Sequence, residues 1–180
     1  RVLSEVAERC YLPANRMMKQ LIELSDGKFK FALAISGVIL EQAKYHRPDL
    51  ITSFQELAET GCVEFLAMPY YASLASLYST GEFAEQVEEH MDLIEELFNQ
   101  RPTVLWNTGM LYSGEKYDYL KSLGYNTFMG FCTDGDSFTF ISEEYVRQGR
   151  VMVTGENMIY NDKWFTGIFD PAAVLDEARN

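Results

Sequence analysis

Short apolar, β-prone runs alternate with helix-length segments along this chain, and that alternation limits its fold more than any other feature. The runs lie near residues 29–36, 62–67, 103–108, 125–131 and 150–154. The segments between them carry apolar residues at helical spacing and are punctuated by Pro and Gly. Strands separated by helices form parallel sheets through right-handed crossovers. The sequence therefore predicts a parallel α/β fold whose functional loops follow the carboxyl ends of the strands.

The expected helices have ordinary start and stop signals. Pro13 and Pro48 suit the first turn of a helix, and Gly61 suits a helix end. A break at residues 11–12 is expected to divide the segment 2–24 into two helices. The other helices are expected at 38–45, 48–58, 82–98, 114–123, 143–148 and 171–178.

Two of the strands end in aromatic-rich loops. The run Val104-Leu105-Trp106 leads into a polar turn, and the run from Cys62 to Ala67 leads into Met68-Pro69-Tyr70-Tyr71. Flat aromatic faces and an amide at a strand end suit the stacking and hydrogen bonding of sugar rings. Core packing is the alternative role, above all for Trp106. The candidate ligand-contacting residues are Tyr70, Tyr71, Trp106, Asn107 and Tyr112.

These segments resemble a known family. The matching motifs are Cys10-Tyr11-Leu12-Pro13-Ala14-Asn15-Arg16, Ile35-Ser36-Gly37-Val38, Ser53-Phe54-Gln55-Glu56-Leu57, Thr60-Gly61-Cys62-Val63-Glu64-Phe65-Leu66-Ala67, Tyr70-Tyr71, Ser73-Leu74-Ala75 and Asn107-Thr108. The chain resembles the catalytic barrel of family 57 glycoside hydrolases, the α-amylase and 4-α-glucanotransferase group. The resemblance covers about residues 1–130 and fades after Phe131. It implies a β/α barrel of seven strands, of which about five are expected here, so the barrel is incomplete.

The chain departs from the family pattern at the positions that carry its chemistry. The resemblance implies a nucleophilic glutamate directly after Asn107-Thr108, where this chain has Gly109. In the preceding loop it implies an acid and a histidine, where this chain has Met68 and Ala72. A retaining glycosidase needs two carboxyl groups flanking the scissile bond. The substitutions therefore predict that hydrolysis by this mechanism is lost, while binding can remain.

Composition favours a globular protein with a neutral ligand. The chain has 180 residues, 47% of them hydrophobic, and a net charge of −12. Such a charge repels phosphate backbones and anionic lipid head groups, so neither nucleic acid nor a membrane is an expected partner. The three cysteines are widely spaced, which favours a reducing, cytoplasmic compartment over a disulfide framework. No linker or repeat divides the sequence, so one domain is expected over residues 1–180, with residues 132–180 outside the resemblance.

Other catalytic or metal-binding arrangements have weaker support. His46 and His90 are the two histidines, too few for a histidine metal triad. Asp134, Asp136 and Glu156 follow predicted strands and could form a rewired carboxylate pair, although turn chemistry alone accounts for them. We expect no metal and no cofactor.

Three functions remain open from the sequence. The first is a family 57-like domain that acts on or binds α-glucans without the usual catalytic residues. The second is a noncatalytic carbohydrate-binding or regulatory domain, and the third is a structural fragment or redesigned scaffold with no ligand. An unclosed parallel sheet also has edges that must be covered, so we expect the C-terminal segment, a second copy or a complementing chain at one edge.

Overall fold

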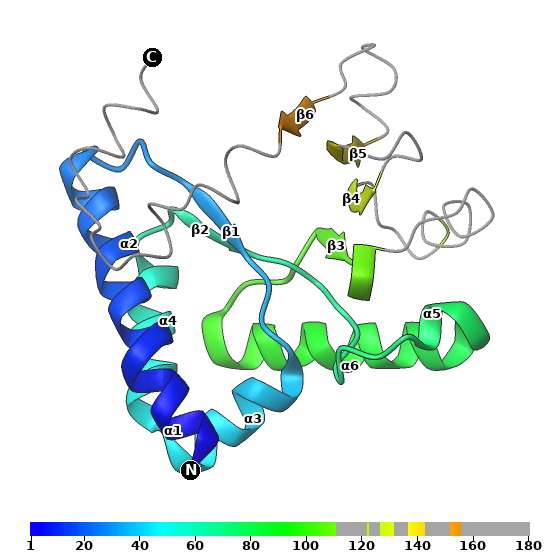
Figure 1. Ribbon diagram of the computed structural model, residues 1–180, viewed down its shortest axis with the longest axis horizontal. Coiled ribbons are helices and arrows are strands. Elements are labelled where there is room, and N and C mark those ends of the chain that lie inside the picture. Colours follow the sequence, from blue (N-terminus) through cyan, green and yellow to red (C-terminus); the bar gives the residue numbers. More distant parts are fainter. Residues whose placement is uncertain (111–121, 123–126, 132–136, 143–151, 156–180) are drawn as a thin grey trace.

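The computed structural model describes residues 1–110, 122, 127–131, 137–142 and 152–155. Helices dominate residues 1–110 (Figure 1). They are α1 (Val2–Val6), η1 (Ala7–Tyr11), α2 (Leu12–Leu24), α3 (Gly37–His46), α4 (Pro48–Glu59), α5 (Ala75–Tyr78), α6 (Thr80–Phe98) and the short turn η2 (Thr108–Met110). The strands are β1 (Phe31–Leu33), β2 (Val63–Phe65), β3 (Val104–Trp106), β4 (Thr127–Phe131), β5 (Ser137–Ser142) and β6 (Met152–Gly155).

The helix predictions for the first hundred residues are confirmed apart from their boundaries and one junction. The expected break at residues 11–12 is wrong, because α1, η1 and α2 follow one another directly and η1 is a single π-helical segment. Pro13 lies in the first turn of α2, where a missing backbone N–H costs no helical hydrogen bond. The helices expected at 114–123, 143–148 and 171–178 lie outside the described residues, apart from Ser122.

The first four strands are parallel, as predicted. β1 pairs with β2 in the register Phe31 to Val63, and β3 pairs with β4 in the register Val104 to Thr127. A bridge joins the two pairs beyond the end of β2: Ala67 N–H donates to the Val104 carbonyl, and Trp106 N–H donates to the Ala67 carbonyl, both at 2.8 Å. The parallel order is therefore β1-β2-β3-β4.

Beyond β4 the sheet is antiparallel, which corrects the all-parallel prediction. β5 pairs antiparallel with both β4 and β6, and β5 itself was not expected from the sequence. The connections, residues 132–136 and 143–151, are shorter than the dozen or so residues that a parallel crossover requires. The described strands thus fall into a parallel pair, β1-β2, and a mixed four-stranded sheet, β3-β4-β5-β6, which the bridge at Ala67 joins; the described residues do not show a barrel.

The side-chain amide of Gln100 fills the gap between β2 and β3 below the bridge. Gln100 Nε2 donates to the Val63 carbonyl at 3.2 Å, and Phe65 N–H donates to Gln100 Oε1 at 3.4 Å. The amide therefore makes the same donor and acceptor pair that a neighbouring strand would make. Two residues beyond Phe65, the backbone of Ala67 bonds directly to β3. The chain from β2 to Ala67 therefore has hydrogen-bond partners on both sides.

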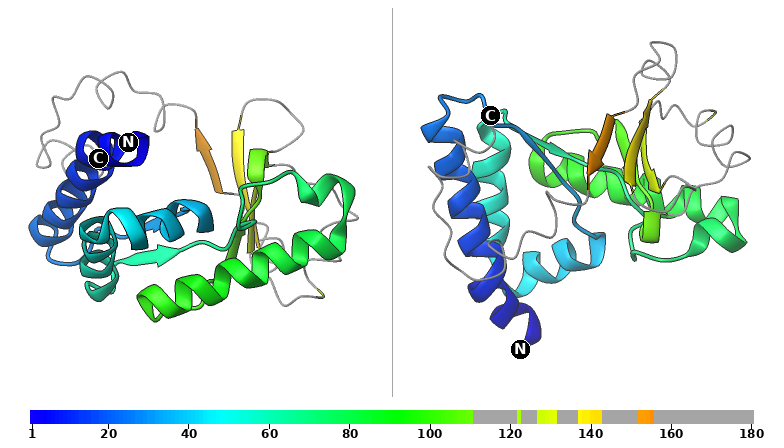
Figure 2. Two further views of the ribbon diagram at one scale, coloured as in Figure 1. Left: turned by 90° about the horizontal axis from the view of Figure 1, so that it is seen from below. Right: turned by 45° about the horizontal axis from the view of Figure 1, so that its top comes forward.

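The main core lies between the helices and the β1–β2 pair. Phe65 of β2 stacks on Phe98 of α6, with ring centroids 4.2 Å apart and nearly parallel planes, and Phe54 of α4 meets the same ring edge-on. A second cluster joins α6 to the bridge region through Phe83, Val87, Met91, Ala67 and Leu105. In both views of Figure 2 the green helix α6 lies beside the strands, and α5 contacts α6. Among the described helices, none combines the length and the apolar composition that crossing a membrane requires.

Candidate functional site

The carboxyl ends of β1, β2 and β3 lie at one edge of the sheet, because these strands are parallel and adjacent (Figure 1). Three segments follow them: Ile35 to Val38, Met68 to Ala72, and Asn107 to Met110. Four of the five residues that the sequence predicted as ligand contacts belong to these strand ends. Tyr112, the fifth, lies outside the described residues.

Tyr70 is a buried part of this edge, with 7% of its surface exposed. Its N–H donates to the carbonyl of Gln86 on α6 at 3.2 Å, and its carbonyl accepts from Val38 N–H at 3.4 Å. The ring lies on Gly37, where any added Cβ would come within 2.6 Å of three ring carbons. Gly37 is therefore required by this close approach. Burial raises the pKa of Tyr70 to about 12, helped by the carboxylates of Glu41 and Glu89, so the phenol stays neutral.

Tyr71 is the exposed member of the pair. It is 56% exposed, and its ring centroid lies 5.0 Å from that of Tyr70 with the planes inclined by 58°. The buried ring thus supports the exposed one.

Trp106 and Asn107 take different roles at the end of β3. Trp106 is half-buried and its backbone completes the bridge to Ala67. Asn107 is 6% exposed, and its Nδ2 donates to the hydroxyl of Ser76 on α5 at 3.0 Å. This contact ties the strand end to α5.

Gly109 has a left-handed backbone. Its φ is +67° and its ψ is 10°, and it is exposed within the turn η2. A residue with a Cβ is strained in this region, whereas glycine is not. In the preceding loop Met68 is buried at 3% exposure, and Ala72 is exposed with a φ of +50°. None of Gly109, Met68 and Ala72 carries a carboxylate or an imidazole.

His90 belongs to this region although the sequence gave it no role. It is fully buried on α6, and its Nε2 lies 2.7 Å from the carbonyl oxygen of Ile35, at the end of β1. Burial lowers the pKa of His90, and the hydrogen bond to Ile35 offsets part of that change. The sequence did contain a signal that His90 is buried, because it lies at helical spacing from the apolar residues Phe83, Val87 and Ile94 on the same face of α6.

Comparison with known proteins identifies the family. The profile of "Glycosyl hydrolase family 57" matches residues 1–160. The chain belongs to glycosyl hydrolase family 57. The match extends beyond the motifs, which fade after Phe131, and so includes the acids Asp134, Asp136 and Glu156. These acids lie outside the described residues.

Two relatives show what this family 57 chain resembles. It is 36% identical over 125 residues to a protein of Methanocaldococcus jannaschii named "Putative alpha-amylase", covering 69% of this chain and 26% of that protein. The fold matches the crystal structure of 4-alpha-glucanotransferase from Thermococcus litoralis with a TM-score of 0.62 and 20% identity, over 71% of this chain and 19% of that one. The chain thus spans about a quarter or less of the length of either relative.

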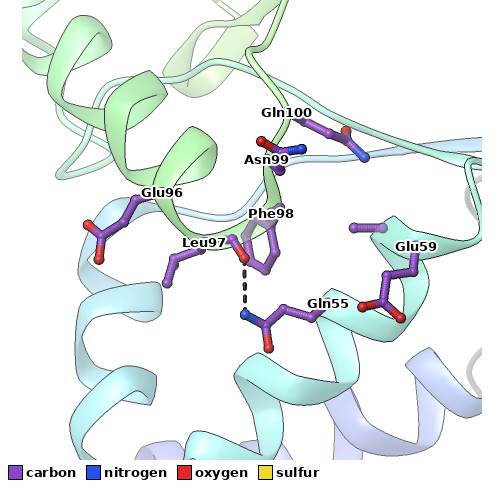
Figure 3. A pocket seen from close by; sticks show the side chains of 8 residues that line it. Gln55, Glu59, Glu96, Leu97, Phe98, Asn99 and Gln100 are labelled. Carbon is purple, nitrogen blue, oxygen red and sulfur yellow. Dashed lines mark hydrogen bonds between the residues drawn. The ribbon is translucent and has the colours of Figure 1, made fainter.

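A separate hollow lies at the opposite ends of the strands in this family 57 chain. It has a volume of about 560 Å³. Figure 3 shows Gln55, Glu59 and Phe98 around it, with the Gln55 amide donating to the Leu97 carbonyl at 3.1 Å. Its lining residues belong to α4, to the end of α6 and to the two residues after α6, and none belongs to the segments that follow the strands. The hollow is therefore distinct from the predicted site. Within the described residues, no group of three or more His, Cys, Asp or Glu side chains could hold a metal ion.

Proposed function

We propose that this family 57 chain binds α-glucans at the carboxyl ends of β2 and β3 and does not hydrolyse them by the retaining mechanism. The observation that carries the proposal is the pairing of Tyr71 with Tyr70. An exposed ring held on a buried one offers a flat, fixed face on which a glucose ring can stack. The names of both relatives refer to α-glucan enzymes, which supports this class of ligand.

Charge supports a neutral ligand at this edge. Glu41 and Glu89 lie close enough to Tyr70 to raise the pKa of its phenol, and the whole chain carries a net charge of −12. An anionic ligand would be repelled, whereas a glucan carries no charge. The glucan hydroxyls would still find carboxylate acceptors near Tyr70, in Glu41 and Glu89.

Loss of retaining hydrolysis follows from the groups offered at the strand ends. A retaining enzyme needs a carboxylate that attacks the anomeric carbon and a second that protonates the leaving group. Gly109 presents only backbone in the position that the family resemblance assigns to the nucleophile. Met68 and Ala72 supply no polar support in the neighbouring loop.

We test the proposal by calorimetric titration of the 180-residue chain with maltoheptaose. Tyr71→Ala removes the exposed ring and should weaken binding roughly 3- to 10-fold, the value of one stacked aromatic contact of about 0.5–1.5 kcal/mol. Tyr45→Ala is the matched control, because Tyr45 is 75% exposed on α3 away from this edge. Equal loss in both variants, or no binding by the unmodified chain, would refute the binding site.

Turnover is measured on the same samples as reducing ends released from amylose and maltoheptaose. We expect none above the level of a heat-denatured sample. Hydrolysis with retained anomeric configuration, together with a glycosyl adduct found by mass spectrometry, would instead place the nucleophile on another acid, such as Asp134, Asp136 or Glu156.

A further inference from the structure

The end of β1, the loop after β2 and helix α6 are held together by three mutual contacts. His90 Nε2 contacts the Ile35 carbonyl at 2.7 Å, which joins α6 to the end of β1. Val38 N–H donates to the Tyr70 carbonyl at 3.4 Å, which joins the segment after β1 to the loop after β2. Tyr70 N–H donates to the Gln86 carbonyl at 3.2 Å, which joins the loop after β2 to α6. Gln86 and His90 are four residues apart, so they lie on one face of the helix.

The hydrogen bond of His90 fixes which ring nitrogen carries the proton. A backbone carbonyl only accepts, so Nε2 must donate, and a neutral ring then leaves Nδ1 as an acceptor. Nδ1 is buried and has no hydrogen-bond partner among the described residues. Protonating Nδ1 would place a second donor, and a charge, in a buried position where the described part of the chain provides no acceptor.

The charged groups around the contact do not compensate for such a charge. Burial is the larger cause of the shift in the pKa of His90 and the Ile35 carbonyl is the other, with no contribution from a carboxylate. Glu41 on α3 and Glu89 on α6 are exposed and act on Tyr70 instead. The segment from Ile35 to Val38 carries no charged side chain, and the loop from Met68 to Ala72 has only the two tyrosines as titratable groups.

We propose that His90 is a positioning residue of the glucan site: the neutral imidazole anchors the end of β1 on α6 and thereby seats Tyr70 beneath Tyr71. The inference rests on the proposed function for its ligand, and on the three contacts for its mechanism. When His90 is protonated, Nε2 can still donate, but the buried charge and the unpaired Nδ1–H favour movement of the ring out of this site, which releases the end of β1 from α6. Gly37 then moves relative to the Tyr70 ring, and the platform for Tyr71 is lost.

Three variants test the proposal in maltoheptaose titrations at pH 7.5, well below their melting temperatures. His90→Gln keeps an amide N–H that can reach the Ile35 carbonyl and should bind within about 3-fold of the unmodified chain. His90→Leu keeps the volume but leaves that carbonyl unpaired, and it should bind at least 10-fold more weakly. His46→Gln, a change of the exposed histidine at the end of α3, is the control and should change nothing. Unchanged affinity in a folded His90→Leu protein would overturn the proposal.

The pH dependence separates positioning from simple packing. The pKa of His90 is lowered in the folded state, so the neutral form is secure above pH 6.5 and is lost as the pH falls through the lowered pKa. Affinity of the unmodified chain should therefore fall as the pH drops below 6.5, while that of His90→Gln stays level over the same range. Because Glu41 and Glu89 are present in both, their titration cannot produce the difference. Identical profiles in the two proteins would overturn the proposal.

A measurement without ligand distinguishes failure of this inference from failure of the proposed function. The backbone amide NMR signals of Gly37 and Tyr70 should shift with pH in step with the His90 ring in the unmodified chain, and should not do so in His90→Gln. If these signals titrate but maltoheptaose does not bind, the positioning role stands and the glucan function is wrong. If they do not follow His90, the positioning role itself is wrong.

Discussion

At the residue scale, the backbone of Gly109 matters as much as its missing side chain. Its φ of +67° is a conformation that costs residues with a Cβ about 1–2 kcal/mol. Replacing Gly109 with Glu should therefore lower the free energy of unfolding by about 1–2 kcal/mol. It should also fail to restore hydrolysis, because a retaining mechanism needs a second carboxyl group. Urea unfolding and reducing-end assays measure the two effects.

The control for this change is Gly109→Asn, because asparagine tolerates the left-handed region better than glutamate. Asn99 illustrates the point in this chain, with a φ of +53° at the end of α6. We expect Gly109→Asn to lose less stability than Gly109→Glu. Rapid hydrolysis by Gly109→Glu would show that a general acid is already in place.

At the element scale, the sheet depends on one side chain between β2 and β3. Replacing Gln100 with Leu removes two hydrogen bonds and leaves the Val63 carbonyl and the Phe65 N–H without this partner. Each buried group left unpaired costs about 1–3 kcal/mol, so for the two groups we expect a loss of about 2–6 kcal/mol in urea unfolding. Gln20→Leu, on the exposed surface of α2, is the matched control. A loss no larger than in this control would mean that β2 and β3 do not need the amide.

At the scale of the whole molecule, β1 is an open edge among the described strands. The register with β2 turns the N–H and carbonyl of Phe31 and Leu33 toward β2, so those of Ala32 face the other way. We expect a second copy or another part of the protein to cover this edge, as an exposed strand edge favours pairing. If a second copy covers the edge, light scattering should show self-association that Ala32→Pro abolishes and Ala32→Ser preserves; if another part of the protein covers it, the chain should be a monomer with a protected Ala32 amide. A monomer whose Ala32 amide exchanges freely with solvent would contradict this expectation.

The sequence predicted much of the first hundred residues because their signals are local. Apolar spacing and proline placement located α3, α4 and α6, and the apolar runs located β1 to β4, since these patterns depend on neighbouring residues. β5 was missed, and β6 runs in the same direction as β4 but pairs antiparallel with β5 instead of joining a parallel sheet. Strand direction is set by pairing across the sheet and by connection length, which composition alone does not reveal.

For the candidate site too, some features could be predicted from the sequence and others depend on tertiary packing. By itself the sequence determined that two strands end in aromatic-rich loops and that Gly109 replaces the expected acid, because strand ends and residue types can be read directly. Only the tertiary structure decided that Tyr70 is buried while Tyr71 is exposed. It likewise brought His90 to Ile35, and Gln100 to β2, across more than thirty residues of chain. These contacts depend on how α6 packs on the sheet, and no local pattern encodes that packing.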